Sequence, residues 1–106
     1  DETQLWVTDG ANSHMHVYDT TVMPPKLMTS LPVRDQPGWV TISIDGRLAY
    51  PSSGDVFDTA SLKLVTQLTD DEGRAVGSEK MLEVDWQGGQ PVRTGDQFGL
   101  GTRLLR

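Results

Sequence analysis

Cysteine is absent from the sequence, which excludes disulfide bonds, thiol catalysis and zinc–thiolate sites. Basic residues are few: 9 Lys and Arg stand against 15 Asp and Glu and give a net charge of −6. Nucleic acids and anionic membranes bind basic surfaces, so this balance predicts neither as a partner. Long apolar runs are also missing, and no stretch approaches the roughly 20 residues with which a helix spans a membrane. The chain therefore reads as one small acidic domain.

A signal peptide and long helices are not indicated either. The first residues, "DETQLWV", lack the basic and then apolar pattern of a signal peptide, so we expect any signal to be absent or already removed. The 11 Gly and 6 Pro are spread along the chain and disfavour long helices. Residues 70–81 ("DDEGRAVGSEKM") are the one candidate for a short helix, but Gly73 and Gly77 within them predict a loop.

Alternating apolar residues predict β-strands. In residues 39–44 ("WVTISI"), Val40, Ile42 and Ile44 fall on one face of an extended chain, which is the period of a strand. Asp45 and Gly46 follow, and they suit the positive φ angles of a tight hairpin. Three further strands are predicted in "RLAY" (47–50), "GDVFDT" (54–59) and "LKLVTQL" (62–68). Short strands in a row, joined by tight turns, predict an antiparallel meander.

The same series occurs earlier in the chain without its first strand. "QLWVTDG" (4–10) resembles "RLAYPSSG" (47–54), "MHVYDTT" (15–21) resembles "GDVFDTA" (54–60), and "KLMTSL" (26–31) resembles "KLVTQL" (63–68). The matched residues of the central motif are Val17 and Val56, Tyr18 and Phe57, Asp19 and Asp58, Thr20 and Thr59. Later, "EKMLEVDWQGG" (79–89) resembles "PGWVTISIDG" (37–46). A repeat of about 40 residues is typical of propeller blades.

These observations predict a single all-β domain, built from antiparallel four-stranded meander blades of β-propeller type. We expect about two blades per chain: a partial first blade in residues 1–36, a second blade in 37–69 and closing strands in 70–106. The polar segments "PVRDQPG" (32–38) and "TDDEGRAVGS" (69–78) lie where one blade would pass to the next.

At the repeated "V-[YF]-D-T" and at "DG-R-L-A-Y" the sequence resembles the YVTN/NHL-type β-propeller repeats of bacterial, mostly exported proteins. Residues 39–68 match that pattern end to end, and residues 5–31 match the last three strands of a preceding blade. The resemblance implies the propeller fold and a periplasmic or extracellular location. It leaves function open, because propellers serve many tasks.

Two blades alone would leave exposed sheet edges, which invite pairing with other chains, whereas a closed propeller covers them. The family's propellers carry about six to eight blades. We therefore expect one of two arrangements. Either the chain is the C-terminal part of a longer propeller, or three or four copies form a homo-oligomer through their exposed sheet edges.

The sharpest candidate site is "SHMHVYD", which holds the only histidines, His14 and His16. On a strand both imidazoles point to the same side, where they could chelate copper, zinc or iron, with Asp9 as a further ligand. The alternative is a pair of solvated or hydrogen-bonded residues near the outer edge of a blade. One His-x-His without an assigned third ligand is a weak motif.

Acidic residues offer a second candidate, a Ca²⁺ site. They are Asp70, Asp71 and Glu72 in one loop and Glu83 and Asp85 on one strand. The alternatives are a solvated turn and a strand with one wet face. No serine, Ser30 included, lies in a Gly-x-Ser-x-Gly elbow, which argues against nucleophilic catalysis. The tryptophans, Trp6, Trp39 and Trp86, suit packing between blades better than sugar stacking.

Three hypotheses of function follow. The favoured one is a non-catalytic module for ligand or protein binding and scaffolding. The resemblance also implies a metal-dependent hydrolase of the propeller lactonase type, in which His14, His16 and a nearby aspartate would hold or activate the attacking water. The third is a copper redox protein that uses the same histidines. A Ca²⁺, Cu²⁺ or Zn²⁺ ion is the only cofactor that the sequence suggests, and the ligand stays open.

Overall fold

The computed structural model describes residues 2–77, 81–96 and 99–100. Within these residues the protein is all-β, as predicted, with ten strands and no helix. The strands are β1 (Gln4–Asp9), β2 (His14–Asp19), β3 (Lys26–Pro32), β4 (Val40–Ile42), β5 (Leu48–Pro51), β6 (Asp55–Asp58), β7 (Leu64–Gln67), β8 (Glu83–Gln87), β9 (Gln90–Asp96) and β10 (Gly99–Leu100). In this part of the chain, no helix is long and apolar enough to cross a membrane.

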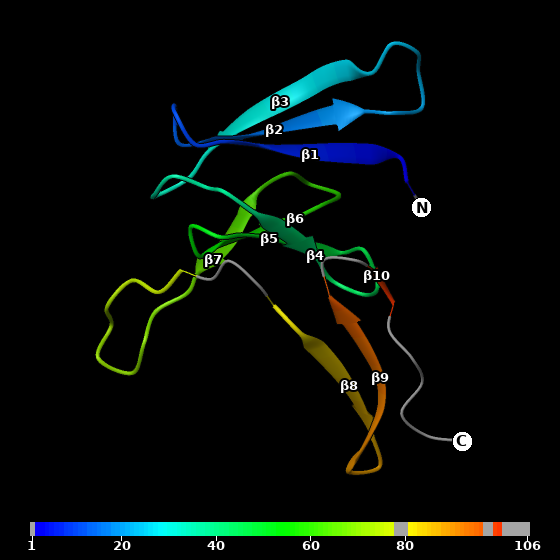
Figure 1. Cartoon of the computed structure of the whole chain (residues 1–106), viewed down its shortest axis with the longest axis vertical. Helices are drawn as coiled ribbons and strands as arrows, with labels where there is room; N and C mark the ends of the chain where they lie inside the picture. The colour runs from blue at the N-terminus through cyan, green and yellow to red at the C-terminus, as the bar shows by residue number, and fades with distance from the viewer. Residues whose placement is uncertain (1, 78–80, 97–98, 101–106) are drawn as a thin grey trace.

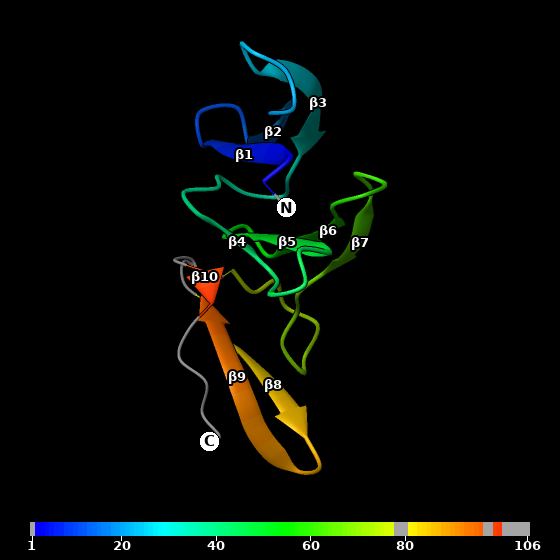
Figure 2. The same ribbon diagram turned by 90° about the vertical axis from the view of Figure 1, so that its right-hand side faces the viewer.

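The strands form three antiparallel sheets, each a meander of consecutive strands. The first sheet has the order β1-β2-β3, the middle sheet β4-β5-β6-β7, and the last sheet β8-β9-β10. The sheets follow one another as successive layers, and the β8–β9 hairpin projects away from the other two sheets in both views (Figures 1 and 2). They lie within residues 1–36, 37–69 and 70–106, while the assignment of these segments as propeller blades stays a prediction.

The repeated aspartate and threonine close the open end of each meander. After β2, the Asp19 carboxylate accepts the Thr21 N–H at 2.8 Å, and bonding to Thr21 holds the Asp19 pKa below its ordinary value. Thr20 donates its N–H to the Thr3 carbonyl at 3.0 Å and its hydroxyl to the Glu2 carbonyl at 2.7 Å. Together these bonds fasten the end of β2 to the start of β1.

The middle sheet repeats both threonine bonds, and its aspartate again accepts hydrogen bonds from the residues that follow. Asp58 accepts two backbone N–H groups of the following turn, at 2.9 and 2.7 Å. Thr59 donates its N–H to the Arg47 carbonyl at 3.0 Å and its hydroxyl to the Gly46 carbonyl at 2.6 Å. We call each of these two sets of hydrogen bonds an Asp-Thr clamp. The clamp is the physical reason for the recurring Asp-Thr pair, because both side chains satisfy backbone groups at a strand end.

The clamps also fix which residues of the two sheets correspond. Asp19 is paired with Gln4 and Asp58 with Leu48, so Trp6 corresponds to Tyr50. Alignment of "QLWVTDG" with "RLAYPSSG" from their first letters would have matched Trp6 with Ala49 instead. The two sheets therefore share the threonine hydrogen bonds in a register one residue away from the simplest sequence comparison, while their assignment as repeats of one propeller unit stays a prediction.

The first sheet packs its buried face on the middle sheet. Met15 and Val17 are fully buried. Val17 is paired with Trp6, so both lie on one face, and the Trp6 ring lies 6.1 Å from the Phe57 ring of β6. This contact agrees with the expectation that Trp6 packs between sheets. For Trp39 and Trp86, which are 37% and 64% exposed, such packing stays a prediction.

The strand predicted over residues 39–44 is shorter than expected. Strand β4 ends at Ile42, and the Ser43 N–H then donates to the Leu48 carbonyl at 2.9 Å across a loop in which Gly46 has φ +75°. Thr41 and Ser43 are buried at 6% and 8% exposure, whereas Ile42 is 38% exposed. The period of two is thus present, but the side that this chain buries is the hydroxyl side.

The linker after β3 is anchored by the side chain of Arg34. Its guanidinium donates to the carbonyls of Ser53 at 2.8 Å, Leu68 at 2.6 Å and Val76 at 2.5 Å. The Arg34 N–H donates to Asp55 at 3.1 Å, and Asp55 is only 1% exposed. One cation therefore ties the linker and the loop after β7 to the middle sheet.

Close approach of these groups requires glycine at position 54. Gly54 has φ +91°, and a Cβ there would lie 2.0 Å from the Val76 carbonyl oxygen and 2.1 Å from the Arg34 guanidinium. Only a residue without a side chain fits both the conformation and the space.

Candidate functional site

The predicted site residues meet on the outward face of the first sheet, near the β1–β2 turn. Asp9 on β1 is paired with His14 on β2, and His16 is paired with Ser30 on β3. Paired residues of an antiparallel sheet share a face, so these four side chains project from the same side. We call Asp9, Asn12, His14, His16 and Ser30 the histidine cluster.

His16 is held by both of its ring nitrogens. Nε2 lies 2.9 Å from the Asp9 carboxylate, and Nδ1 lies 2.8 Å from the Ser30 hydroxyl. The Asp9 and His16 side chains are 23% and 27% exposed, so this chain of contacts is partly shielded from solvent. Sequence analysis found the histidine and the aspartate but missed Ser30.

His14 makes a separate set of contacts. Its Nδ1 lies 2.6 Å from the Asn12 carbonyl oxygen, which can only accept, so Nδ1 carries the proton. In the neutral ring Nε2 is then an acceptor. The His14 and His16 rings are nearly parallel, with an interplanar angle of 9° and centroids 6.3 Å apart.

Asp9 is the anionic end of the cluster. Hydrogen bonds from the Asn12 side chain and then from His16 lower the pKa of Asp9 from 3.8 to about 2. The Asn12 N–H and amide donate to the two carboxylate oxygens at 3.1 and 3.0 Å. Asp9 is therefore an ionised acceptor at neutral pH, fixed by the turn that leads from β1 to β2.

This geometry does not support the metal hypothesis. Nowhere in residues 2–77, 81–96 and 99–100 do three His, Asp or Glu side chains gather so that they could hold a metal ion. Asp9 and His16, two of the expected ligands, are hydrogen-bonded to each other. Metal binding at Asp9, His14 and His16, and the lactonase and copper hypotheses that depend on it, stay predictions without a supporting contact.

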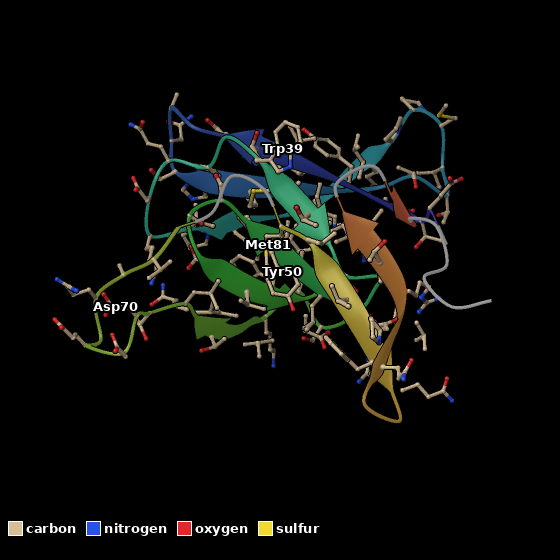
Figure 3. The ribbon with its side chains drawn as sticks, turned by 60° about the horizontal axis from the view of Figure 1, so that its bottom comes forward. Trp39, Tyr50, Asp70 and Met81 are labelled. Atoms are coloured by element: carbon tan, nitrogen blue, oxygen red, sulfur yellow. The ribbon has the colours of Figure 1, made fainter. Side chains whose placement is uncertain are left out.

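The acidic loop has a structural explanation. Asp70 accepts the backbone N–H groups of Glu72 and Arg74 at 2.9 and 2.8 Å, and the Arg74 guanidinium pairs with its carboxylate at 2.8 Å. These bonds lower the pKa of Asp70, with the Arg74 N–H as the largest cause. Figure 3 places Asp70 at a loop far from Tyr50 and Met81. The residues behave as a solvated, self-capped turn, which is the alternative to a Ca²⁺ site.

The strand carboxylates are also engaged within the protein. Asp85 pairs with the Arg93 guanidinium at 2.8 Å across β8 and β9. Glu83 accepts the Ile44 N–H at 2.6 Å and so connects the last sheet to the middle sheet. Neither carboxylate gathers with other acidic groups into a metal site among the described residues.

A crevice of about 160 Å³ separates the middle sheet from the start of the last sheet. It is lined by Thr41, Ile42, Ser43, Tyr50, Met81, Leu82 and Glu83. Figure 3 shows Tyr50 and Met81 side by side at this place. Burial, followed by the negative charges of Glu83 and Asp45, raises the pKa of Tyr50, so its hydroxyl stays protonated. The crevice is small and half open, and it has the size of a packing gap between sheets.

Comparison with known proteins gives no match. No family model, no curated protein and no solved structure matches the chain. The function has to be argued from the geometry of the sheets themselves.

Proposed function

We propose that the chain is a β-propeller-type blade module of a binding and scaffolding protein, completed by further sheets from a longer parent chain or from other copies. The observation that carries the proposal is apolar surface on both outer layers of the stack. Such surface on a soluble domain marks a site where another protein surface packs.

The first sheet leaves half of its outward face apolar. Leu5, Val7 and Leu27 are 48%, 38% and 48% exposed. Leu5 and Leu27 both pair with Tyr18, and Val7 pairs with His16, so the apolar residues form a band on the face opposite the buried Val17. The histidine cluster lies at one end of this face, at the β1–β2 turn, and the apolar band covers the other.

The last sheet and one edge strand show the same feature. In the last sheet Trp86 is 64% exposed on β8, and Leu82, just before β8 at the crevice, is 66% exposed. Strand β7 lies at the edge of the middle sheet with Leu64 and Val65 at 51% and 56% exposure. Covering each such side chain would contribute about 1 kcal/mol, so a sheet that covers several at once gains enough to dock.

The extended shape of the molecule supports the proposal that further sheets pack against it. Its radius of gyration is 14.8 Å, against about 13 Å for a compact chain of 106 residues. Successive antiparallel meanders, the two Asp-Thr clamps and the Trp6–Phe57 contact between layers all fit stacked blades. The bacterial, exported origin that the sequence resemblance implies stays an expectation.

Sedimentation of the purified chain tests the proposal. We expect either stable association above the 11.7 kDa monomer or, if the parent chain normally covers the faces, a monomer that unfolds without cooperativity. Leu82→Ser with Trp86→Ser should lower association, whereas Met23→Ser, on a loop where Met23 is 87% exposed, should not. A monodisperse monomer with a cooperative unfolding transition contradicts the proposal.

A second measurement separates this function from the enzymatic hypotheses. The double variant His14→Ala, His16→Ala keeps all the apolar side chains of the band, although His16 is paired with Val7 at its border, and should associate as the unchanged chain does. Elemental analysis of the purified protein reads out any Ca²⁺, Cu²⁺ or Zn²⁺ independently of association.

A further inference from the structure

Three side chains from three different strands form a continuous hydrogen-bonded relay. The Ser30 hydroxyl of β3 lies 2.8 Å from His16 Nδ1 on β2, and His16 Nε2 lies 2.9 Å from the Asp9 carboxylate of β1. All three residues lie on the same outward face, and Ser30 is exposed.

The positions of the protons follow from what each partner can do. The ionised Asp9 carboxylate can only accept, so His16 Nε2 carries a proton. In the neutral imidazole Nδ1 then has a free lone pair, and the Ser30 hydroxyl must donate to it. The serine proton therefore already points at a base, and the base is oriented by an anion. This is the logic of a serine nucleophile with a general base, although the two ring nitrogens exchange their usual roles.

We propose that Ser30 is a nucleophile toward carboxylic esters with His16 as general base and Asp9 as positioning residue. Ser30 Oγ forms a bond to the ester carbonyl carbon while its proton passes to His16 Nδ1 and the carbonyl π electrons move to oxygen. Collapse of the tetrahedral intermediate breaks the carbon–alkoxy bond, and the leaving alcohol takes the proton from Nδ1. Water then attacks the acyl-Ser30 ester by the same route, which releases a carboxylic acid and restores the hydroxyl.

The neighbourhood indicates which esters fit. Val7, paired with His16, is 38% exposed, and Met28, near Ser30 on β3, is 49% exposed. An apolar acyl group could rest on these side chains while its carbonyl meets Ser30.

The protein contains its own comparison serine. Ser61 is also exposed, and its hydroxyl bonds to the Asp58 carboxylate rather than to an imidazole. General-base assistance by a placed imidazole typically accelerates a reaction by about 10²–10⁴-fold. Because the proposal invokes general-base assistance alone, we expect Ser30 to react about 10²-fold faster than Ser61.

The test is site-resolved labelling of the intact chain with diisopropyl fluorophosphate, followed by peptide mass spectrometry. Ser30 should be modified about 10²-fold faster than Ser61 in the same molecules, and p-nitrophenyl acetate should give a transient acetyl group on Ser30. This comparison needs no substitution, so it does not depend on whether a variant folds. Equal rates at Ser30 and Ser61 would overturn the proposal.

Variants assign the roles. His16→Gln should bring the Ser30 rate down to the Ser61 rate, and Asp9→Asn should lower it while Asp9→Glu, which keeps the charge, recovers part of the loss. The Ser61 rate and the far-ultraviolet circular dichroism report whether each variant keeps its fold. A His16→Gln chain that folds and still labels at the unchanged Ser30 rate would also overturn the proposal.

Discussion

Replacement of Gly54 by alanine should destabilise the fold far more than the same change at another glycine with a positive φ. The added Cβ would lie 2.0 Å from the Val76 carbonyl oxygen and 2.1 Å from the Arg34 guanidinium, at φ +91°. Gly46 is the matched control, because it has φ +75° and no atom lies within 4 Å of the position that a Cβ would take there. Both substitutions carry backbone strain, and only Gly54→Ala forces neighbouring groups apart.

The magnitude follows from the contacts that must be lost. Strain of alanine at positive φ costs about 1–2 kcal/mol at either site. At position 54 the Arg34 guanidinium must also move, which removes its bonds to the Leu68 and Val76 carbonyls at 2.6 and 2.5 Å. Hydrogen bonds from a charged donor contribute about 1.5–3 kcal/mol each. With solvent replacing part of that loss, we expect about 3–5 kcal/mol for Gly54→Ala against about 1–2 kcal/mol for Gly46→Ala.

Urea unfolding followed by tryptophan fluorescence measures the difference at a fixed protein concentration. In an Arg34→Met background the extra penalty of Gly54→Ala should shrink, because the guanidinium no longer competes for the space. Free energies of unfolding for Gly54→Ala and Gly46→Ala that agree within about 0.5 kcal/mol would refute the reasoning, since that is the usual scatter of substitutions without a specific mechanism.

Three further predictions concern the middle and first sheets. Asp55 is 1% exposed and accepts three hydrogen bonds, which Asp55→Ala removes. This change should lower the free energy of unfolding by about 3 kcal/mol, and Asp55→Asn should lower it less in the same urea titration. Thr59→Val and Thr20→Val each delete one clamp hydroxyl bond and should each cost about 1 kcal/mol, and a Thr59→Val variant as stable as the unchanged chain would disprove the role of the clamp. Because the folded-state pKa of Asp9 is about 2 against an ordinary 3.8, its contribution is complete above about pH 4 and is lost as the pH falls toward 2. Asp9→Asn should therefore lower the stability by a constant amount above about pH 4 and remove the Asp9 part of the slope between about pH 4 and 2, as measured by urea unfolding across that range.

The fold class could be predicted because the signals of a strand are local. A period of two, turn residues such as Asp45-Gly46, and the recurring Asp-Thr pair are all properties of short segments. Each depends on neighbours within a few residues, and the described chain is all-β with antiparallel meanders. A short segment does not indicate which face of its strand another sheet will cover. The burial of Thr41 rather than Ile42 could therefore not be predicted.

The candidate site was predictable only in part, for the same reason. His14, His16 and Asp9 share a hairpin, so their proximity follows from a short turn. Ser30 reaches His16 through the register of β2 with β3, which shifts at a bulge between Val17 and Tyr18. A shift of one residue in that register would send Ser30 to the opposite face, and no local pattern fixes it.

Arg34 makes long-range contacts that the composition of its linker does not predict. It sits in a polar linker that sequence reasoning treats as a connection between blades, yet its guanidinium bonds carbonyls 19, 34 and 42 positions away. An arginine that serves only backbone carbonyls has no partner of opposite charge to signal it in the sequence.

The Asp-Thr clamps bear on how such a chain can change in length over evolution. The donors and acceptors of each clamp belong to one sheet and the turns beside it, so gain or loss of an entire sheet would leave the other clamp whole. A break within the middle sheet would instead separate the Thr59 hydroxyl from the Gly46 carbonyl that accepts its hydrogen bond. We therefore expect exchange of chain segments at the linkers to disturb these hydrogen bonds less than exchange within a meander.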